Sequence, residues 1–193
     1  VSRPVLVGHS LGGAIVLAMA LERPEQVGAL VLLTPLTHPV AKPNPIFDGL
    51  RVRSRLLRRL LGYTIAVPLA RQKTKETLDE VFAPEPWPED FGIRAGGVLG
   101  LRPKGYVTTS GDLVAVEDEI EAQAGRYGTL KMPGFVLLAD GDTLLPNAEQ
   151  GSPLSEHGFT IETLTGRGHM LPLTAPDDCA KLIRTAVAQA AKA

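Results

Sequence analysis

The chain has 193 residues, enough for one domain with a sizeable core. Its formal net charge of -1 gives no whole-chain argument for nucleic acid or an anionic membrane, so we expect no nucleic-acid partner and no membrane contact. The single cysteine, Cys179, excludes an internal disulfide and a cysteine-based zinc site, and its helical context predicts a small buried side chain.

The first predicted elements are a strand, a tight turn and a helix. Residues 5–7 form an apolar run typical of a buried strand, and the glycine-rich segment 8–13 predicts a turn. Apolar residues at helical spacing then predict a helix that stops at Arg23 and Pro24, and residues 27–33 form a second apolar strand. Continuous apolar strands that alternate with helices predict a parallel sheet covered on both faces.

Residues 35–130 interrupt this alternation and are predicted to form a mostly helical insertion. Leucines at i,i+4 spacing predict a helix within residues 50–61, and residues 106–124 predict another. The aromatic side chains of the insertion are expected either to line an acyl pocket or to form the insertion's own core: Tyr63, Phe82, Trp87 and Phe91.

Basic residues gather on and after the leucine-bearing helix of this insertion: Arg51, Arg53, Arg55, Arg58, Arg59, Arg71, Lys73 and Lys75. One interpretation is a cap that attracts anionic substrates, and a second is a basic amphipathic helix that contacts a membrane surface. The third interpretation is a solvated outer face on a helix whose leucines cover the active site.

The alternation resumes in residues 131–193. Strands are predicted over 135–139 and 159–164, and a helix is predicted after Pro146. A final helix is predicted over 174–191 with Thr174 as its N-cap. We therefore predict an α/β fold whose sheet has about four parallel strands, contributed by residues 1–34 and 131–193 on either side of the insertion.

The segment Gly8-His9-Ser10-Leu11-Gly12 has the pattern of a nucleophile elbow. A nucleophilic serine stands on a sharp turn between a strand and a helix, and glycine fits at the crowded positions beside it. Ser10 is therefore the candidate nucleophile. The alternative is a glycine-rich turn that binds an anion at a helix N-terminus, but the lysine and the G-x-G spacing of a phosphate loop are absent.

A serine nucleophile needs a base, and the base needs an acid that orients it. In hydrolases of this topology the chain order is Ser, then Asp or Glu, then His. Among the four histidines, His169 is the candidate base, because it follows the last predicted strand and precedes the final helix. Asp140 and Asp142 both follow the 135–139 strand as candidate acids, and we expect one of them to be only a turn residue.

Three segments resemble those of the α/β-hydrolase superfamily. Residues 5–13 resemble its nucleophile segment, residues 142–146 its acid loop and residues 166–172 its histidine loop. The acid-loop resemblance selects Asp142 over Asp140. The region that holds the insertion is also where this family places its variable cap.

The resemblance implies a serine esterase that hydrolyses a small-molecule carboxylic ester or a similar acyl bond. In that reaction Ser10 attacks the carbonyl, His169 transfers the proton and Asp142 orients His169, while the Leu11 amide forms part of the oxyanion hole. No metal or organic cofactor is implied. The rival functions are carbon–carbon bond hydrolysis or cofactor-free perhydrolysis on the same triad, a non-catalytic relative of the fold, and an inactive truncated chain.

The resemblance also indicates that a part of the fold precedes this chain. Family members have several strands before the elbow, and a loop among them normally supplies the second oxyanion donor. We therefore expect a fragment whose native N-terminus is absent, with an exposed strand edge at Val5–Val7 that can associate with another chain. Because no signal peptide is visible, we expect a cytoplasmic location.

Overall fold

The computed structural model describes residues 3–192 and divides the chain into two compact units. Unit 1 consists of Val1–Ala41, Ala83–Glu85 and Glu119–Ala193, and unit 2 consists of Lys42–Phe82 and Pro86–Asp118. The predicted insertion, 35–130, is thus wider than unit 2. Thr37 belongs to unit 1 because its carbonyl accepts a hydrogen bond from the Tyr127 hydroxyl, at 2.8 Å, and Tyr127 is fully buried in the unit 1 core.

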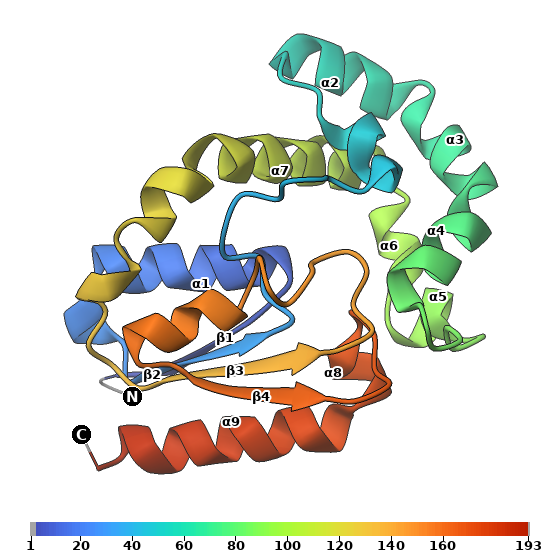
Figure 1. Ribbon diagram of the computed structural model, residues 1–193. Coiled ribbons are helices and arrows are strands. Elements are labelled where there is room, and N and C mark those ends of the chain that lie inside the picture. Colours follow the sequence, from blue (N-terminus) through green and yellow to red (C-terminus); the bar gives the residue numbers. More distant parts are fainter. Residues whose placement is uncertain (1–2, 193) are drawn as a thin grey trace. The chain divides into compact units, whose positions relative to one another are not determined.

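Unit 1 contains a parallel sheet of four strands, as predicted, and the strand order is β1-β2-β3-β4 (Figure 1). The strands are β1 (Val5–His9), β2 (Ala29–Leu33), β3 (Gly134–Ala139) and β4 (Thr160–Leu164). Within the described residues β1 pairs only with β2, so it is an edge strand, and Val7 is exposed on it. All four strands end at the same edge of the sheet because they are parallel.

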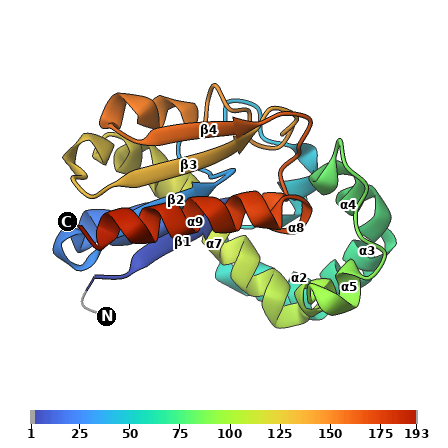
Figure 2. The ribbon, with the colours of Figure 1, turned by 90° about the horizontal axis from the view of Figure 1, so that it is seen from below.

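Helices cover the two faces of this sheet, with α1 (Leu11–Glu22) on one and α9 (Pro176–Ala190) on the other (Figures 1 and 2). Side chains along β2 alternate between these faces. Leu30 and Leu32 belong to the core on the α1 side, whereas Val31 and Leu33 belong to the core on the α9 side. Each fully buried leucine contributes about 1.5–3 kcal/mol to stability, which explains why β2 is a continuous apolar run.

The C-terminal helical region begins differently from the prediction. A short helix, α8 (Leu171–Thr174), precedes α9, and Ala175 is the N-cap of α9 with no side-chain capping bond. Thr174 is therefore not the predicted N-cap, and its hydroxyl is buried without a hydrogen-bond partner among the described residues. Pro176 sets the break, because proline favours the first helical position and cannot continue a helix from α8. Cys179 is buried in α9, as predicted.

The helix predicted after Pro146 is also absent from the structure. Residues 147–151 form turns, and a 3-10 helix follows over Ser152–His157. Asn147 donates its side-chain amide to the Ala139 carbonyl at 3.0 Å, and such a bond to the backbone competes with helix formation. Three further 3-10 helices lie at Pro24–Gln26, Pro45–Leu50 and Tyr127–Thr129.

Unit 2 is mostly helical. Its helices are α2 (Arg55–Tyr63), α3 (Ala66–Gln72), α4 (Thr74–Phe82), α5 (Phe91–Arg94), α6 (Gly97–Gly100) and the first part of α7 (Pro103–Ala124), which continues into unit 1. No helix within residues 3–192 is both long and apolar enough to cross a membrane.

The aromatic residues of unit 2 do not share one environment. Phe82 and Phe91 pack edge to face with their ring centroids 5.3 Å apart, so they form core within the unit. Trp87 donates its indole N–H to Asp79 at 3.0 Å, and Tyr63 is exposed. Of the two open interpretations, a core role therefore describes the two phenylalanines.

Candidate active site

The candidate residues gather at the edge of the sheet where the strands end. Ser10 directly follows β1, and Thr34 directly follows β2. The segment 140–142 follows β3, and the segment 166–169 lies just beyond β4. The parallel topology therefore brings together chain segments that lie up to 159 residues apart in the sequence.

Ser10 stands on a strained turn between β1 and α1. Its backbone has a φ of 53° and a ψ of -125°, and a positive φ is rare for a residue with a side chain. The turn is fixed on both sides, because the Ser10 N–H donates to the Leu33 carbonyl at 3.1 Å and the Ser10 carbonyl accepts from the Leu36 N–H at 2.9 Å. Such strain costs about 1–3 kcal/mol and is typical of functional sites.

The glycines around Ser10 have unequal roles. A Cβ atom on Gly8 would lie 2.3 Å from the Gly12 carbonyl oxygen, and one on Gly13 would lie 2.5 Å from Pro35 Cβ. These two positions therefore require glycine. Nothing lies within 4 Å of a Cβ on Gly12, so the expectation that crowding requires glycine there is wrong for this turn.

Replacing Gly8 and Gly12 by alanine, one at a time, should distinguish the crowded position from the open one. We expect Gly8→Ala to destabilise the fold by about 1–3 kcal/mol, because its Cβ meets the backbone of α1. Gly12→Ala should leave stability unchanged or raise it by up to about 1 kcal/mol, since alanine is the better helix former and Gly12 lies in α1. Urea unfolding of both variants measures the difference, and equal losses would contradict the role assigned to Gly8.

His169 and Asp142 form a buried hydrogen-bonded pair. The distance from His169 Nδ1 to Asp142 Oδ2 is 2.7 Å, and the two side chains are 5% and 1% exposed. The other carboxylate oxygen of Asp142 accepts the backbone N–H groups of Leu144 and Leu145 at 2.9 and 3.0 Å. Asp142 is thereby fixed in orientation, and the bond to Nδ1 directs His169 Nε2 away from the carboxylate.

Asp140 has a different position from Asp142. It is exposed, and its Oδ1 accepts the N–H of Gly166 at 2.7 Å instead of contacting the imidazole of His169. The Gly141 N–H then donates to the Arg167 carbonyl at 2.9 Å. The acid loop and the histidine loop are thus joined at three successive residues, and only Asp142 reaches His169.

Ser10 and His169 are not hydrogen-bonded in this structure. Among residues 3–192 neither the Ser10 hydroxyl nor His169 Nε2 makes a hydrogen bond. Leu11 is the first residue of α1, and the N–H groups of a helix's first turn lack intrahelical partners. Its amide therefore has no partner within α1, and its part in an oxyanion hole stays a prediction.

Two residues that the sequence did not identify hold the backbone of His169. His9 Nε2 donates to the His169 carbonyl at 2.9 Å, and Thr34 Oγ1 donates to the same oxygen at 2.8 Å. Burial lowers the pKa of His9 below its ordinary value of 6.5, which favours the neutral ring. A neutral His9 keeps a second positive charge away from the His169 ring, whose centroid is 5.0 Å from that of His9.

Glu85 is a third such residue, and it belongs to the short segment that returns from unit 2 to unit 1. Its carboxylate accepts the Gly168 N–H at 3.0 Å and the guanidinium of Arg167 at 2.6 Å, and it is 14% exposed. Arg167 also donates to the Thr174 carbonyl at 3.0 Å. Glu85 therefore fixes the position of Arg167 and Gly168, the two residues that precede His169 in the histidine loop.

Removing the charge of Glu85 should lower the free energy of unfolding by an amount that depends on the pH. Burial acts to raise the pKa of Glu85, but the Gly168 N–H and Arg167 outweigh it and hold this pKa below the ordinary value of 4.5. A carboxylate with a depressed folded-state pKa stabilises the fold above about pH 4.5, and this stabilisation is lost as the pH falls through the folded-state value.

We therefore expect Glu85→Gln to lower the free energy of unfolding by about 1–3 kcal/mol at pH 7, with a smaller difference from the wild type near pH 3. Urea unfolding at the two pH values measures this. Glu89→Gln changes an exposed glutamate that has no bonded partner among the described residues, and it should have little effect. A loss for Glu85→Gln that is equal at both pH values would contradict the role of its charge.

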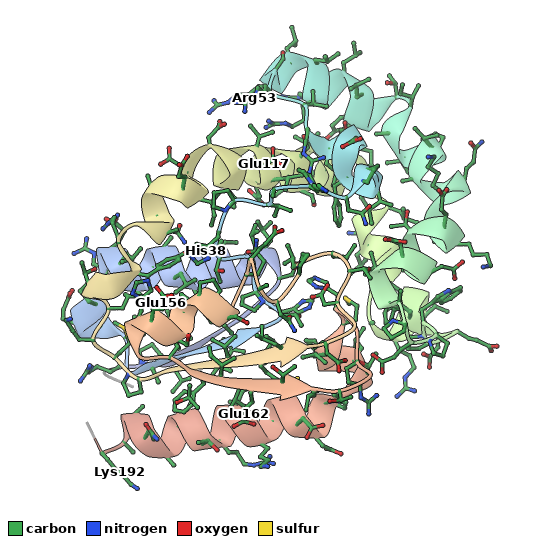
Figure 3. The ribbon with its side chains drawn as sticks, in the orientation of Figure 1. His38, Arg53, Glu117, Glu156, Glu162 and Lys192 are labelled. Carbon is green, nitrogen blue, oxygen red and sulfur yellow. The ribbon has the colours of Figure 1, made fainter. Side chains whose placement is uncertain are left out.

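The other two histidines, His38 and His157, make no hydrogen bond to Asp142 or His169 within residues 3–192. His38, labelled in Figure 3, is 2.8 Å from Thr37 Oγ1, and burial lowers its pKa. Its ring packs edge to face on Tyr127, whose pKa burial raises to about 12. No group of three or more His, Cys, Asp or Glu side chains that could hold a metal ion occurs within residues 3–192.

Comparison with known proteins agrees with this architecture. The model of the Alpha/beta hydrolase family matches residues 1–182. "Lipase LipV" of Mycobacterium tuberculosis is 49% identical over 49 residues, which are 25% of this chain and 16% of that protein.

Two solved structures share the fold over almost the whole chain. An alpha/beta hydrolase enzyme from a Medee basin deep-sea metagenome library superposes with a TM-score of 0.65 at 15% identity, over 97% of this chain and 66% of that one. A thermophilic esterase from Thermogutta terrifontis superposes with a TM-score of 0.58 at 16% identity, over 98% of this chain and 66% of that one. This chain therefore spans about two thirds of the length of these relatives.

Proposed function

Because the chain belongs to the alpha/beta hydrolase family, we propose that the protein hydrolyses a carboxylic ester or a similar acyl bond through Ser10, His169 and Asp142. The observation that carries the proposal is the buried bond of 2.7 Å between His169 Nδ1 and Asp142 Oδ2, at the same sheet edge as the strained Ser10. An unbonded Nε2 on an imidazole whose Nδ1 is held by a carboxylate is suited to accept a proton from a serine.

In the proposed reaction Ser10 Oγ attacks the carbonyl carbon while His169 Nε2 accepts the hydroxyl proton. Asp142 holds the imidazole in the tautomer that leaves Nε2 free and stabilises the imidazolium that forms. The Leu11 N–H donates to the oxyanion, and His169 then returns the proton to the leaving alcohol. Water hydrolyses the acyl-serine by the same steps, which releases the acid and regenerates Ser10.

The test is covalent labelling with a fluorophosphonate, a reagent that modifies activated serines. We expect a single labelled serine, Ser10, identified by peptide mapping, and a loss of labelling in His169→Ala because the hydroxyl then lacks its base. A label on any other serine overturns the assignment of Ser10. Labelling of Ser10 that persists in His169→Ala overturns the role of His169.

A further inference from the structure

Helix α2 turns leucines away from unit 2 rather than into it. Its inner side is marked by Gly62, where a Cβ would lie 2.9 Å from Val107 Cγ2 and 3.1 Å from the Pro103 carbonyl oxygen, so α2 approaches α7 closely there. On its outer side Leu56 is 81% exposed and Leu60 is 60% exposed. Neither side chain is therefore part of the packing within unit 2.

The next helix also carries exposed apolar side chains. Ile65, which precedes α3, is 60% exposed, and Leu69 within α3 is 51% exposed. Both pairs have i,i+4 spacing, which places each pair on one side of its helix. Single exposed leucines are ordinary, but exposed apolar pairs on two consecutive helices, here called the apolar stripe, are typical of a binding surface.

The same region of the chain is strongly cationic. Residues 51–75 contain eight arginines and lysines and no acidic residue. Four of the eight are bonded within unit 2, either to carboxylates or to a backbone carbonyl: Arg51, Arg53, Arg58 and Lys75. Figure 3 labels Arg53, and it also labels Glu117, whose carboxylate pairs with Arg51. The other four form no ion pair among residues 3–192: Arg55, Arg59, Arg71 and Lys73.

The free charges adjoin the apolar stripe. Arg55 and Arg59 are spaced i,i+4 and share one side of α2, which flanks the side that carries Leu56 and Leu60 at an angle of about 100° around the helix. A helix with apolar side chains along one side and arginines beside them has the composition of helices that lie flat in the boundary layer of a membrane. This set of side chains is named the basic-apolar face: Arg55, Leu56, Arg59, Leu60, Ile65 and Leu69.

We propose that the basic-apolar face docks on the surface of an anionic lipid bilayer. Lipid chains would cover the four apolar side chains, and anionic headgroups would neutralise Arg55 and Arg59. A second copy of the chain fits less well, because pairing two such faces would bring the arginines of both copies together. The proposal concerns unit 2 alone and does not depend on the proposed hydrolase activity.

Co-sedimentation with vesicles tests the proposal. We expect the protein to bind vesicles of phosphatidylcholine and phosphatidylglycerol, to bind pure phosphatidylcholine far less, and to dissociate as the salt concentration rises. Arg55→Gln/Arg59→Gln should lower the partition coefficient roughly thirtyfold, and Leu56→Gln/Leu60→Gln should lower it at least about tenfold. Both pairs are exposed, so circular dichroism should show the wild-type fold.

Helix α5 provides matched controls within the same unit. Ile93 is 84% exposed and Arg94 is exposed beside it, but neither belongs to the basic-apolar face. Ile93→Gln and Arg94→Gln should bind vesicles as the wild type does. Equal loss in these controls, or equal binding to both kinds of vesicle, overturns the proposal. A wild-type dimer that becomes monomeric in Leu56→Gln/Leu60→Gln overturns it in favour of self-association.

A site-specific probe shows which side chains enter the lipid. Cys179 is buried, so an introduced surface cysteine is the site that a thiol-reactive dye labels. With an environment-sensitive dye on Leu60→Cys, we expect a blue shift and an intensity increase on anionic vesicles, and no change with the dye on Ile93→Cys. Binding of the vesicles without a blue shift at position 60 would place the contact elsewhere and overturn the proposal.

Discussion

Ser10→Ala is expected to lower kcat for ester hydrolysis by about 10⁵- to 10⁶-fold, to the level left by substrate binding and the oxyanion donors. The reason is that no other hydroxyl stands on the turn that joins β1 to α1, where the Leu11 N–H opens the helix. Steady-state kinetics on a soluble chromogenic ester measures the loss. KM should change little, because the hydroxyl contributes to the reaction rather than to substrate binding.

Two further serine substitutions complete this prediction. Ser54→Ala removes the side-chain cap of α2 in unit 2 and leaves Ser10, Asp142 and His169 of unit 1 in place, so kcat should stay within about twofold. Ser10→Gly should also abolish turnover, but it should raise the free energy of unfolding by about 1 kcal/mol, since glycine adopts the φ of 53° without strain. Retention of more than a hundredth of the activity in Ser10→Ala would refute Ser10 as the nucleophile.

The two central strands, β2 and β3, could be predicted from the sequence because they are buried on both faces. A strand such as β3 must be apolar at every position when helices cover both sides, and a continuous apolar run stands out from the surrounding chain. The ends of these runs then located the functional loops. Ser10 and His169 could be proposed from sequence because each lies just beyond a predicted strand. The same position left Asp140 and Asp142 equivalent, and the resemblance to the acid loop selected Asp142.

The residues that hold these loops could not be predicted, because their roles depend on contacts between distant parts of the chain. Glu85 lies in a proline-rich segment, and its contact with Gly168 spans 83 residues with no local pattern. Thr34 resembles an ordinary residue at the end of a strand, yet its hydroxyl bonds to His169, 135 residues away. Thr174 was misassigned for a related reason, since the break at Pro176 overrides the preference of threonine for an N-cap.

The glycine pattern illustrates a limit of motif reasoning. The elbow motif treats the glycines on both sides of the serine alike, whereas the structure makes Gly8 and Gly13 necessary and leaves space at Gly12. The requirement at Gly13 arises from Pro35, a residue that follows β2 and is not part of the motif. A motif therefore predicts where glycines occur, but the packing around each position determines which of these glycines the fold requires.

Asp142→Asn should lower kcat by about 10⁴-fold while the fold and the side-chain packing are retained. An asparagine here would keep its oxygen toward the N–H groups of Leu144 and Leu145, which now bond to Asp142 Oδ1. Its amide nitrogen would then face His169 Nδ1. Two donors cannot pair, so the imidazole would carry its proton on Nε2, where it can no longer accept the proton of Ser10.

Asp140→Asn is the matched control, because the same change is made two residues away in the same loop. Asp140 Oδ1 accepts the Gly166 N–H, and an asparagine oxygen can do the same, so we expect kcat to fall by less than about tenfold. The sequence alone left these two aspartates equivalent by position. If Asp140→Asn loses as much activity as Asp142→Asn, the buried Asp142–His169 bond is not what orients the base, and the assignment of the acid is wrong.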